Sequence, residues 1–137
     1  MCLEFYVIPT TQNKVSAERV ARASGLSVKK VNKPIKGALH FSRGGGCSCS
    51  LLSDNAGWSK PVWSLESEIL EGLSSALEVL GKEAGGFTLR ALWIGDDVET
   101  ESELSLSEML DEIRGNRVRN RHTYKVRGAV SATQHPH

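Results

Sequence analysis

The chain has 137 residues, of which 39% are apolar and 24% are charged, so it can bury an ordinary core and is neither a disordered nor a fibrous sequence. This length suits one domain, which we expect to span residues 1–127, with a loose tail at 128–137. No apolar run is long enough to cross a membrane, and residues 1–10 lack the basic start of a secretion signal. We therefore expect a cytoplasmic location.

The formal net charge of +1 conceals three blocks of different sign. Residues 1–50 hold eight Lys and Arg against two acids, residues 51–113 hold three against fourteen acids, and residues 114–137 hold six and no acid. The acidic block can fold against the two basic blocks and screen them. Alternatively, the basic blocks share a face that attracts a phosphate, a nucleic acid or an acidic protein. The sequence leaves both arrangements open.

Alternating apolar and polar residues predict a strand at residues 3–8 and another at residues 38–43. Between these strands, Ser16 can cap a short helix, and Gly25 is placed to end it. Residues 26–37 fit neither pattern clearly. The first half of the chain thus predicts a strand, a helix and one or two further strands.

The second half begins with apolar residues at helical spacing over residues 65–80, which predict a helix. A strand is expected at residues 87–94, followed by an acidic exposed loop at 96–103. A capping box that begins at Ser105 predicts a last helix, and alternation predicts a final strand at residues 122–127.

This order predicts an α+β fold, a single-domain sandwich with a mostly antiparallel sheet of four to five strands and about three helices packed on one face, in a ferredoxin-like type of arrangement. If the apolar side of the first strand meets the helices, the opposite sheet face is polar and open. Such a face is solvated, mediates dimerisation or binds a ligand. The expected polar residues of this face are Glu4, Tyr6, His40, Arg90, Lys125 and Arg127.

The segment 43–50, with the sequence Arg-Gly-Gly-Gly-Cys-Ser-Cys-Ser, is the densest chemical signal in the chain. Its three glycines free the backbone to turn N–H groups toward an anion, and Arg43 adds a positive charge. The segment lacks the Lys-Ser/Thr ending of a nucleotide P-loop and the spacing of a dinucleotide fingerprint. The expected ligand-binding residues are Arg43, Gly44, Gly45, Gly46, Cys47, Cys49 and His40.

Cys47 and Cys49 are two positions apart, so in an extended segment their sulfur atoms project on the same side. There they can hold a soft metal or cycle between dithiol and disulfide, and either thiol can serve as the nucleophile of a thiol-dependent enzyme. A structural zinc site takes four ligands, and only Cys2 and His40 could complete it, so no metal and no cofactor are assigned. The alternative is that both cysteines are small core residues.

Residues 16–35 carry a second motif, with packing, turn and cap residues at Val20, Ala21, Arg22, Gly25, Ser27 and Val31. With these residues the segment resembles the helix-turn-helix of bacterial repressors of the LacI type. The resemblance implies that DNA would be contacted by Val28, Lys29, Lys30, Asn32 and Lys33. Pro34 departs from the pattern because the motif has an apolar helical residue there. A helix followed by a strand is the alternative for this segment.

The sequence therefore favours a binding protein that holds a small anionic ligand or a soft metal at residues 43–49 and the adjoining sheet face. DNA binding through residues 16–35 and a thiol-dependent enzyme are the alternatives. A basic stretch at 114–121 could grip phosphates or complement the dipole of the preceding helix. We also expect the chain to form a homo-oligomer.

Overall fold

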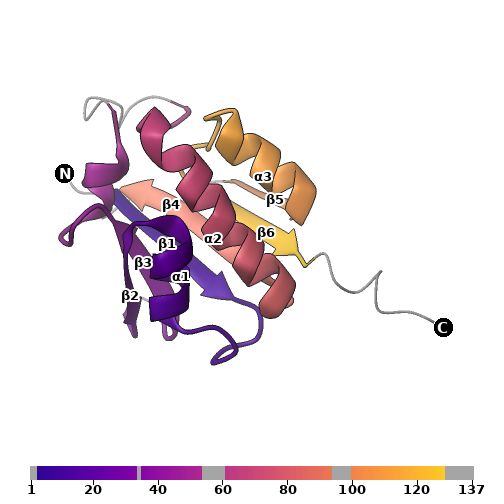
Figure 1. Ribbon diagram of the computed structural model, residues 1–137. Coiled ribbons are helices and arrows are strands. Elements are labelled where there is room, and N and C mark those ends of the chain that lie inside the picture. Colours follow the sequence, from indigo (N-terminus) through magenta and orange to yellow (C-terminus); the bar gives the residue numbers. More distant parts are fainter. Residues whose placement is uncertain (1–2, 34, 54–60, 94–99, 129–137) are drawn as a thin grey trace.

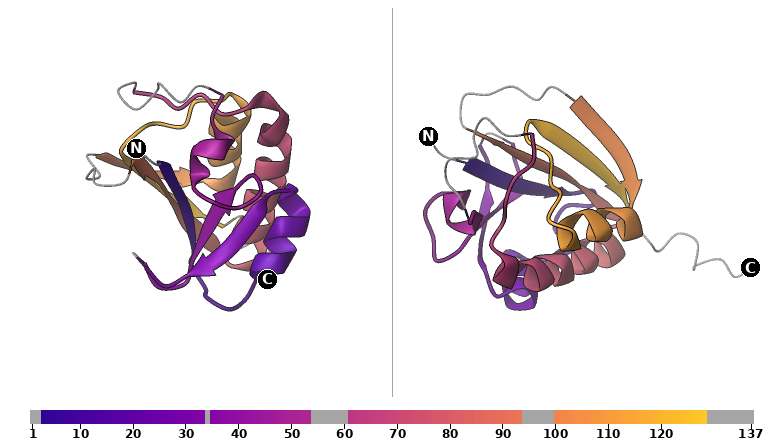
Figure 2. Two further views of the ribbon diagram at one scale, coloured as in Figure 1. Left: turned by 90° about the vertical axis from the view of Figure 1, so that its left-hand side faces the viewer. Right: turned by 90° about the horizontal axis from the view of Figure 1, so that it is seen from above.

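The computed structural model describes residues 3–33, 35–53, 61–93 and 100–128, and Figure 1 shows its ribbon. In these ranges, six strands form one mixed sheet in the order β2-β3-β1-β4-β6-β5. Figure 2 shows the helices gathered on one side of this sheet. The elements are β1 (Leu3–Pro9), α1 (Ala17–Ser24), β2 (Ser27–Val31), β3 (Ala38–Ser42), α2 (Leu70–Glu83), β4 (Gly86–Trp93), β5 (Thr100–Ser105), α3 (Leu106–Arg114) and β6 (His122–Arg127).

All neighbouring strands are antiparallel except β5 and β6, which are parallel because α3 returns the chain to the end at which β5 began. The molecule is thus an α+β structure with three α-helices and a six-stranded mixed sheet in its described part. Two short 3-10 turns, η1 (Ser48–Leu51) and η3 (Ser67–Ile69), complete the described elements. No helix in the described ranges is long and apolar enough to cross a bilayer.

The expected caps of the first helix are present. The Ser16 hydroxyl accepts a hydrogen bond from the backbone N–H of Arg19 at 3.1 Å, and Gly25, with φ 73°, donates its N–H to the Ala21 carbonyl at 2.8 Å. Residues 27–31 then form β2, antiparallel to β3, so the second helix of a helix-turn-helix is absent. The prediction of a helix-turn-helix at 16–35 was therefore wrong. Left-handed Gly25 turns the chain, and β-branched Val28 and Val31 favour a strand.

The second helix begins later than its apolar spacing predicts. Leu65 is buried but lies in an isolated bridge with Leu52, and α2 starts at Leu70, after η3. Asn116 holds this segment, because its side-chain oxygen accepts from Leu65 N at 2.9 Å and its amide donates to Leu65 O at 3.0 Å. The apolar residues before the helix thus reach the core as an extended segment.

The expected acidic loop at 96–103 was wrong for its described part, since residues 100–105 form β5; residues 94–99 lie outside the described residues. The alternation was hard to detect because two of the three positions on the helix side are small and polar, Thr100 and Ser102. Both hydroxyls bond the ring of His122 on β6, at 2.6 Å to Nδ1 and 2.7 Å to Nε2. Hydrogen bonds rather than apolar burial fix this strand.

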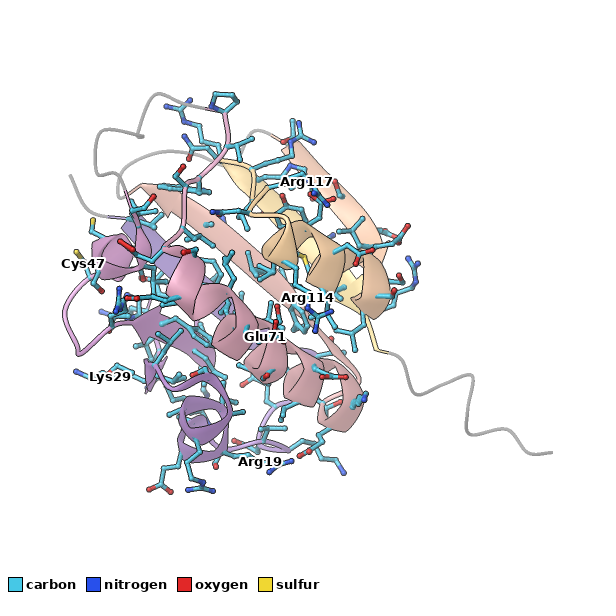
Figure 3. All side chains as sticks on the ribbon, turned by 45° about the horizontal axis from the view of Figure 1, so that its top comes forward. Arg19, Lys29, Cys47, Glu71, Arg114 and Arg117 are labelled. Carbon is cyan, nitrogen blue, oxygen red and sulfur yellow. The ribbon has the colours of Figure 1, made fainter. Side chains whose placement is uncertain are left out.

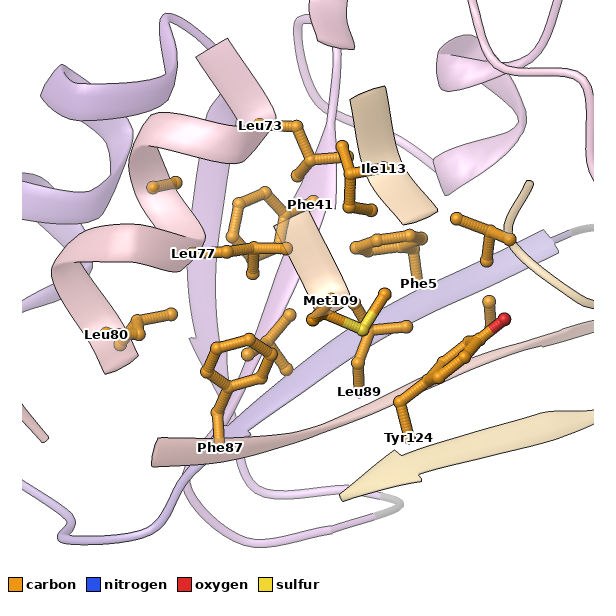
Figure 4. Packing of buried hydrophobic residues seen from close by; sticks show 14 of the residues in the cluster. Phe5, Phe41, Leu73, Leu77, Leu80, Phe87, Leu89, Met109, Ile113 and Tyr124 are labelled. Carbon is orange, nitrogen blue, oxygen red and sulfur yellow. The ribbon is translucent and has the colours of Figure 1, made fainter. Parts of the chain in front are cut away.

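The core lies between the sheet and the helices (Figure 4). Phe5 and Phe41 meet edge to face, with ring centroids 5.8 Å apart. Leu73, Leu77 and Leu80 of α2 are fully buried opposite them, as their helical spacing predicted. The buried face of the last helix is also confirmed, with Leu106, Met109, Leu110 and Ile113.

The sheet face opposite the helices, here called the open face, carries a continuous row of polar side chains. Strand register makes each member a neighbour of the next across all six strands. The row, from β2 to β5, is Lys29, His40, Tyr6, Arg90, Thr123 and Glu101. The expected placement of His40, Tyr6 and Arg90 on one face is therefore confirmed.

Candidate functional site

The segment 43–49, here called the Gly/Cys loop, has a backbone that requires glycine. Gly44, Gly45 and Gly46 have φ of 105°, 96° and 80°, and a Cβ at any of them would meet no atom within 4 Å. Serine hydroxyls use two of the loop's N–H groups, since Arg43 N donates to Ser50 at 2.8 Å and Gly45 N donates to Ser42 at 3.1 Å. These hydrogen bonds occupy backbone N–H groups that would otherwise be available to an anion.

Arg43 lies beside a hollow of about 610 Å³ on the helix side of the sheet. Its guanidinium bonds the Glu68 carboxylate at 2.5 Å, which neutralises the charge expected to attract an anion. The hollow also borders Ser24 and Gly25, where α1 ends, and the C-terminal end of a helix carries partial negative charge. His40 does not line this hollow, because its ring lies beside Tyr6 and contacts Ser48, so it does not share one site with Arg43.

Cys49 completes the hydrogen bonding of β1. Strand β3 pairs with β1 only at two positions, Tyr6 with His40 and Val7 with Leu39. Beyond them, the Cys49 sulfur accepts the Leu3 N–H at 3.1 Å. The expected extended segment is a 3-10 turn that begins after Cys47, which lies at the surface (Figure 3). In the described ranges, no three His, Cys, Asp or Glu side chains converge as a metal site would require.

Ser48 has the same structural task and is fully buried. Its hydroxyl accepts the Phe5 N–H at 3.0 Å and donates to the Phe41 carbonyl at 2.5 Å. The His40 Nε2 atom lies 3.2 Å from this hydroxyl and 3.2 Å from the Glu4 carboxylate. A nucleophilic triad uses the two different ring nitrogens, whereas here both partners meet Nε2 and the hydroxyl proton is committed to a carbonyl. Ser48, His40 and Glu4 therefore form a structural hydrogen-bonding group, here called the structural junction, and not a catalytic triad.

Tyr6 ends this junction on the open face. Its hydroxyl donates to Glu4 at 2.9 Å, and its ring lies 5.5 Å from that of His40. Burial and then the bond to Glu4 raise the pKa of Tyr6 to about 12, so the phenol keeps its proton at neutral pH. Tyr6 is therefore not available as a ready base.

Arg90 differs from these groups because its bonding is incomplete. It lies in the middle of the open face on β4, between Tyr6 and Thr123 in the row. Its Nε atom is buried and has no hydrogen-bond partner among the described residues. An unmet buried donor costs about 1–3 kcal/mol, so an acceptor that reached it would be stabilising.

A shallow depression of about 460 Å³ surrounds Arg90, and we call it the Arg90 depression. Thr88 lies on the same strand as Arg90 and pairs with Ile8 on β1, whereas Thr123 on β6 lies between Arg90 and Glu101. The lining residues of the depression are Ile8, Ile35, Thr88, Arg90, Glu101 and Thr123. The sequence placed Arg90 on this face but did not identify the depression. Strand register is needed to bring Glu101 to it, and Glu101 lay in the expected loop.

The acidic middle of the chain pairs with both basic ends. Figure 3 shows Glu71 of α2 near Arg114 at the end of α3, with 3.8 Å between their charged atoms. Among the described residues, the other pairs that join blocks are Arg19 with Glu83, Arg43 with Glu68, Arg117 with Glu112, and Lys125 with Glu101. Strands β3, β1 and β4 separate β2 from β6, so the basic residues on these two strands are not neighbours in the sheet. Screening is the arrangement that the structure favours.

The basic stretch at 114–121 also has structural contacts. Arg117 lies 3.5 Å from the Glu112 carboxylate and donates to the Asp111 carbonyl at 3.0 Å. The backbone N–H of Arg119 donates to the Tyr124 hydroxyl at 2.8 Å. These contacts explain the stretch as a connection between α3 and β6 without a phosphate ligand.

No family model, curated protein or solved structure matches this chain.

Proposed function

We propose that the protein binds a small organic anion on the open face of its sheet and that Arg90 is the anion-binding residue. The observation that carries this proposal is the Arg90 Nε donor, buried and without a partner among the described residues. Bonds from a guanidinium to a carboxylate are shorter and stronger than neutral ones and are often two-pronged. A carboxylate is therefore the group that gains most at this position.

The surroundings of Arg90 favour an organic anion over an inorganic one. Thr88 and Thr123 offer hydroxyl groups beside the guanidinium, which suits the remaining lone pairs of an anion. Ile8 and Ile35 offer apolar surface that an inorganic ion could not use. This supports a ligand with a charged head and a short apolar body.

The same proposal moves the expected anion site from the Gly/Cys loop to the adjoining sheet face. Arg43 is paired with Glu68, whereas Arg90 makes no ion pair with another described residue. We propose binding rather than catalysis because the Ser48 hydroxyl and the Cys49 sulfur both serve β1. A cytoplasmic location and a homo-oligomer stay predictions from the sequence.

We further propose that β1 to β4 with α1 and α2 form a ferredoxin-like unit. Its support is the β-α-β-β-α-β order with strands arranged β4-β1-β3-β2, each antiparallel to the next. Strands β6 and β5 extend this unit beyond β4. The Arg90 depression would then lie where the extension joins the unit.

A nuclear magnetic resonance titration with 4-methylpentanoate tests the binding proposal. We expect amide shifts at Thr88, Arg90 and Thr123, and binding at least about tenfold weaker in Arg90→Gln, because a charge-assisted bond is worth about 1.5–3 kcal/mol. The matched control is Lys29→Gln, an exposed cation in the same row, which should change affinity less than about twofold.

Unchanged affinity in Arg90→Gln, with the variant folded by circular dichroism, would overturn the proposal. So would shifts confined to residues 24–26 and 43–44, which border the hollow at the Gly/Cys loop. The variant Arg90→Lys keeps the charge but loses the planar fork, so we expect it to fall between the wild type and Arg90→Gln.

A further inference from the structure

The Arg90 depression contains groups of opposite charge that do not neutralise each other. Arg90 on β4 and Glu101 on β5 are separated in the cross-sheet row by Thr123 on β6. No ion pair joins Arg90 to Glu101 among the described residues, and the Glu101 carboxylate instead lies 3.3 Å from the Lys125 ammonium. A ligand with both charges could contact both residues.

The spacing of the strands suits such a ligand. Neighbouring strands lie about 4.8 Å apart, so the backbones of Arg90 and Glu101 are separated by roughly 10 Å across β6. The depression that these residues line together with Thr123 has a volume of about 460 Å³, which leaves room for a small molecule. One small molecule is therefore long enough to contact both Arg90 and Glu101.

Three chemical features follow one another across the depression. Ile8 lies on β1, Arg90 on β4 and Glu101 on β5, so an apolar surface, a cation and an anion occur in that order. We propose that the ligand is a zwitterion, an α-amino acid with an apolar side chain. Arg90 binds its carboxylate, Glu101 binds its ammonium group, and Ile8 with Ile35 contacts its side chain. This inference rests on the proposed anion binding at Arg90.

The ion pair between Glu101 and Lys125 does not prevent this role. Their side chains are 57% and 52% exposed, and ion pairs that are so exposed are weak. An incoming ammonium can therefore replace or share the contact with Lys125. The carboxylate of Glu101 also disfavours a phosphate or a nucleic-acid backbone, because like charges in one depression repel.

Three molecules that share the isobutyl side chain of leucine separate the contributions. L-leucine carries both charges, 4-methylpentanoate lacks the ammonium group, and 3-methylbutylamine lacks the carboxylate. We expect L-leucine to bind at least about tenfold more tightly than 4-methylpentanoate, which corresponds to about 1.4 kcal/mol. The amine should bind most weakly, because Arg90 repels it. Amide shifts in a titration give all three affinities.

The variant Glu101→Gln should lower the affinity for L-leucine, whereas the affinity for 4-methylpentanoate should not fall, because the variant removes a carboxylate that repels this anion. The matched control is Glu103→Gln, on the same strand and face but paired in register with Lys125 and outside the depression. It should leave both affinities within about twofold of the wild type. Thermal melting of each variant checks folding.

The outcomes distinguish the two proposals. If 4-methylpentanoate binds through Arg90 as tightly as L-leucine, the zwitterion inference is wrong and the proposed anion binding stands. The same holds if Glu101→Gln leaves the preference for L-leucine unchanged. If neither carboxylate binds, or inorganic phosphate binds more tightly than both, the proposed function fails as well.

Discussion

In the Gly/Cys loop, Glu68 holds the Arg43 guanidinium and serine hydroxyls occupy two backbone N–H groups, whereas on the open face Arg90 keeps a buried donor with no described partner. Three glycines, two cysteines and one arginine are consecutive or nearly so in the loop. The open face spreads its residues over strands that are distant in sequence. Residue types therefore indicate where a site is chemically possible. Buried donors that have no partner after folding indicate where a ligand would be stabilised.

The largest effect should come from removing Ser48, which would show that the loop region is structural. Ser48→Ala leaves the Phe5 N–H and the Phe41 carbonyl without their side-chain partner, and we expect the free energy of unfolding to fall by about 2–3 kcal/mol. Urea unfolding measures this. Ser53→Ala, which removes an exposed bond to the Ser64 carbonyl, is the control and should cost less than about 1 kcal/mol.

A second substitution tests the loop backbone itself. Gly46 has φ 80° and open space around it, so Gly46→Ala should cost about 1–2 kcal/mol through conformation alone. Gly46→Asn should cost less, because asparagine tolerates the left-handed region. Binding of 4-methylpentanoate should not change in either variant. A loss of binding at normal stability would show that the loop, and not only the open face, binds the ligand.

A third, smaller effect concerns His122, whose two ring nitrogens are both bonded, unlike Arg90 Nε. Burial first, and then the nearby charge of Arg119, lower the pKa of His122, while Glu101 opposes them. The folded protein thus favours the neutral ring, and its stability should fall as pH drops through the ordinary histidine pKa of about 6.5.

The test is the unfolding free energy at pH 5 to 8, compared between the wild type and His122→Gln. The variant should flatten the decrease on the acidic side, even if it is less stable at every pH. An equal slope in both proteins would show that His122 does not carry this pH dependence.

The smallest effect is expected at Arg43. Its side chain and that of Glu68 are 38% and 65% exposed, so Arg43→Gln should change stability by less than about 1 kcal/mol. Binding of 4-methylpentanoate should stay within about twofold of the wild type, in contrast to Arg90→Gln. A tenfold loss in Arg43→Gln would show that the loop takes part in binding after all.

Most elements could be predicted from local patterns because their signals are local. The Ser16 and Gly25 caps and the capping box at Ser105 involve residues within a few positions of one another, and all are present. The apolar alternation did not predict β5, because Thr100 and Ser102 on its helix side form hydrogen bonds with His122, which lies twenty or more positions later. Long-range hydrogen bonds of this kind leave no periodic trace.

The candidate site was harder to predict than the fold. Alternation placed Arg90 and His40 on the open face correctly, but only strand register shows that Thr123 and Glu101 are the next residues across the sheet. The charge blocks gave two alternatives, and the ion pairs between blocks favour screening. Sequence patterns report residue types, but they do not report which donors stay unsatisfied after folding.

The position of β6 between β4 and β5 has a consequence for synthesis on the ribosome. β5 precedes β6 in the chain, yet β6 is its described sheet neighbour. Until residues 122–127 emerge, β5 cannot join the sheet and α3 has only part of its packing surface. Arg90 can therefore be in place on a nascent chain before Glu101 is. The Arg90 depression, which Thr123 and Glu101 also line, is therefore complete only after β6 and β5 have joined the sheet.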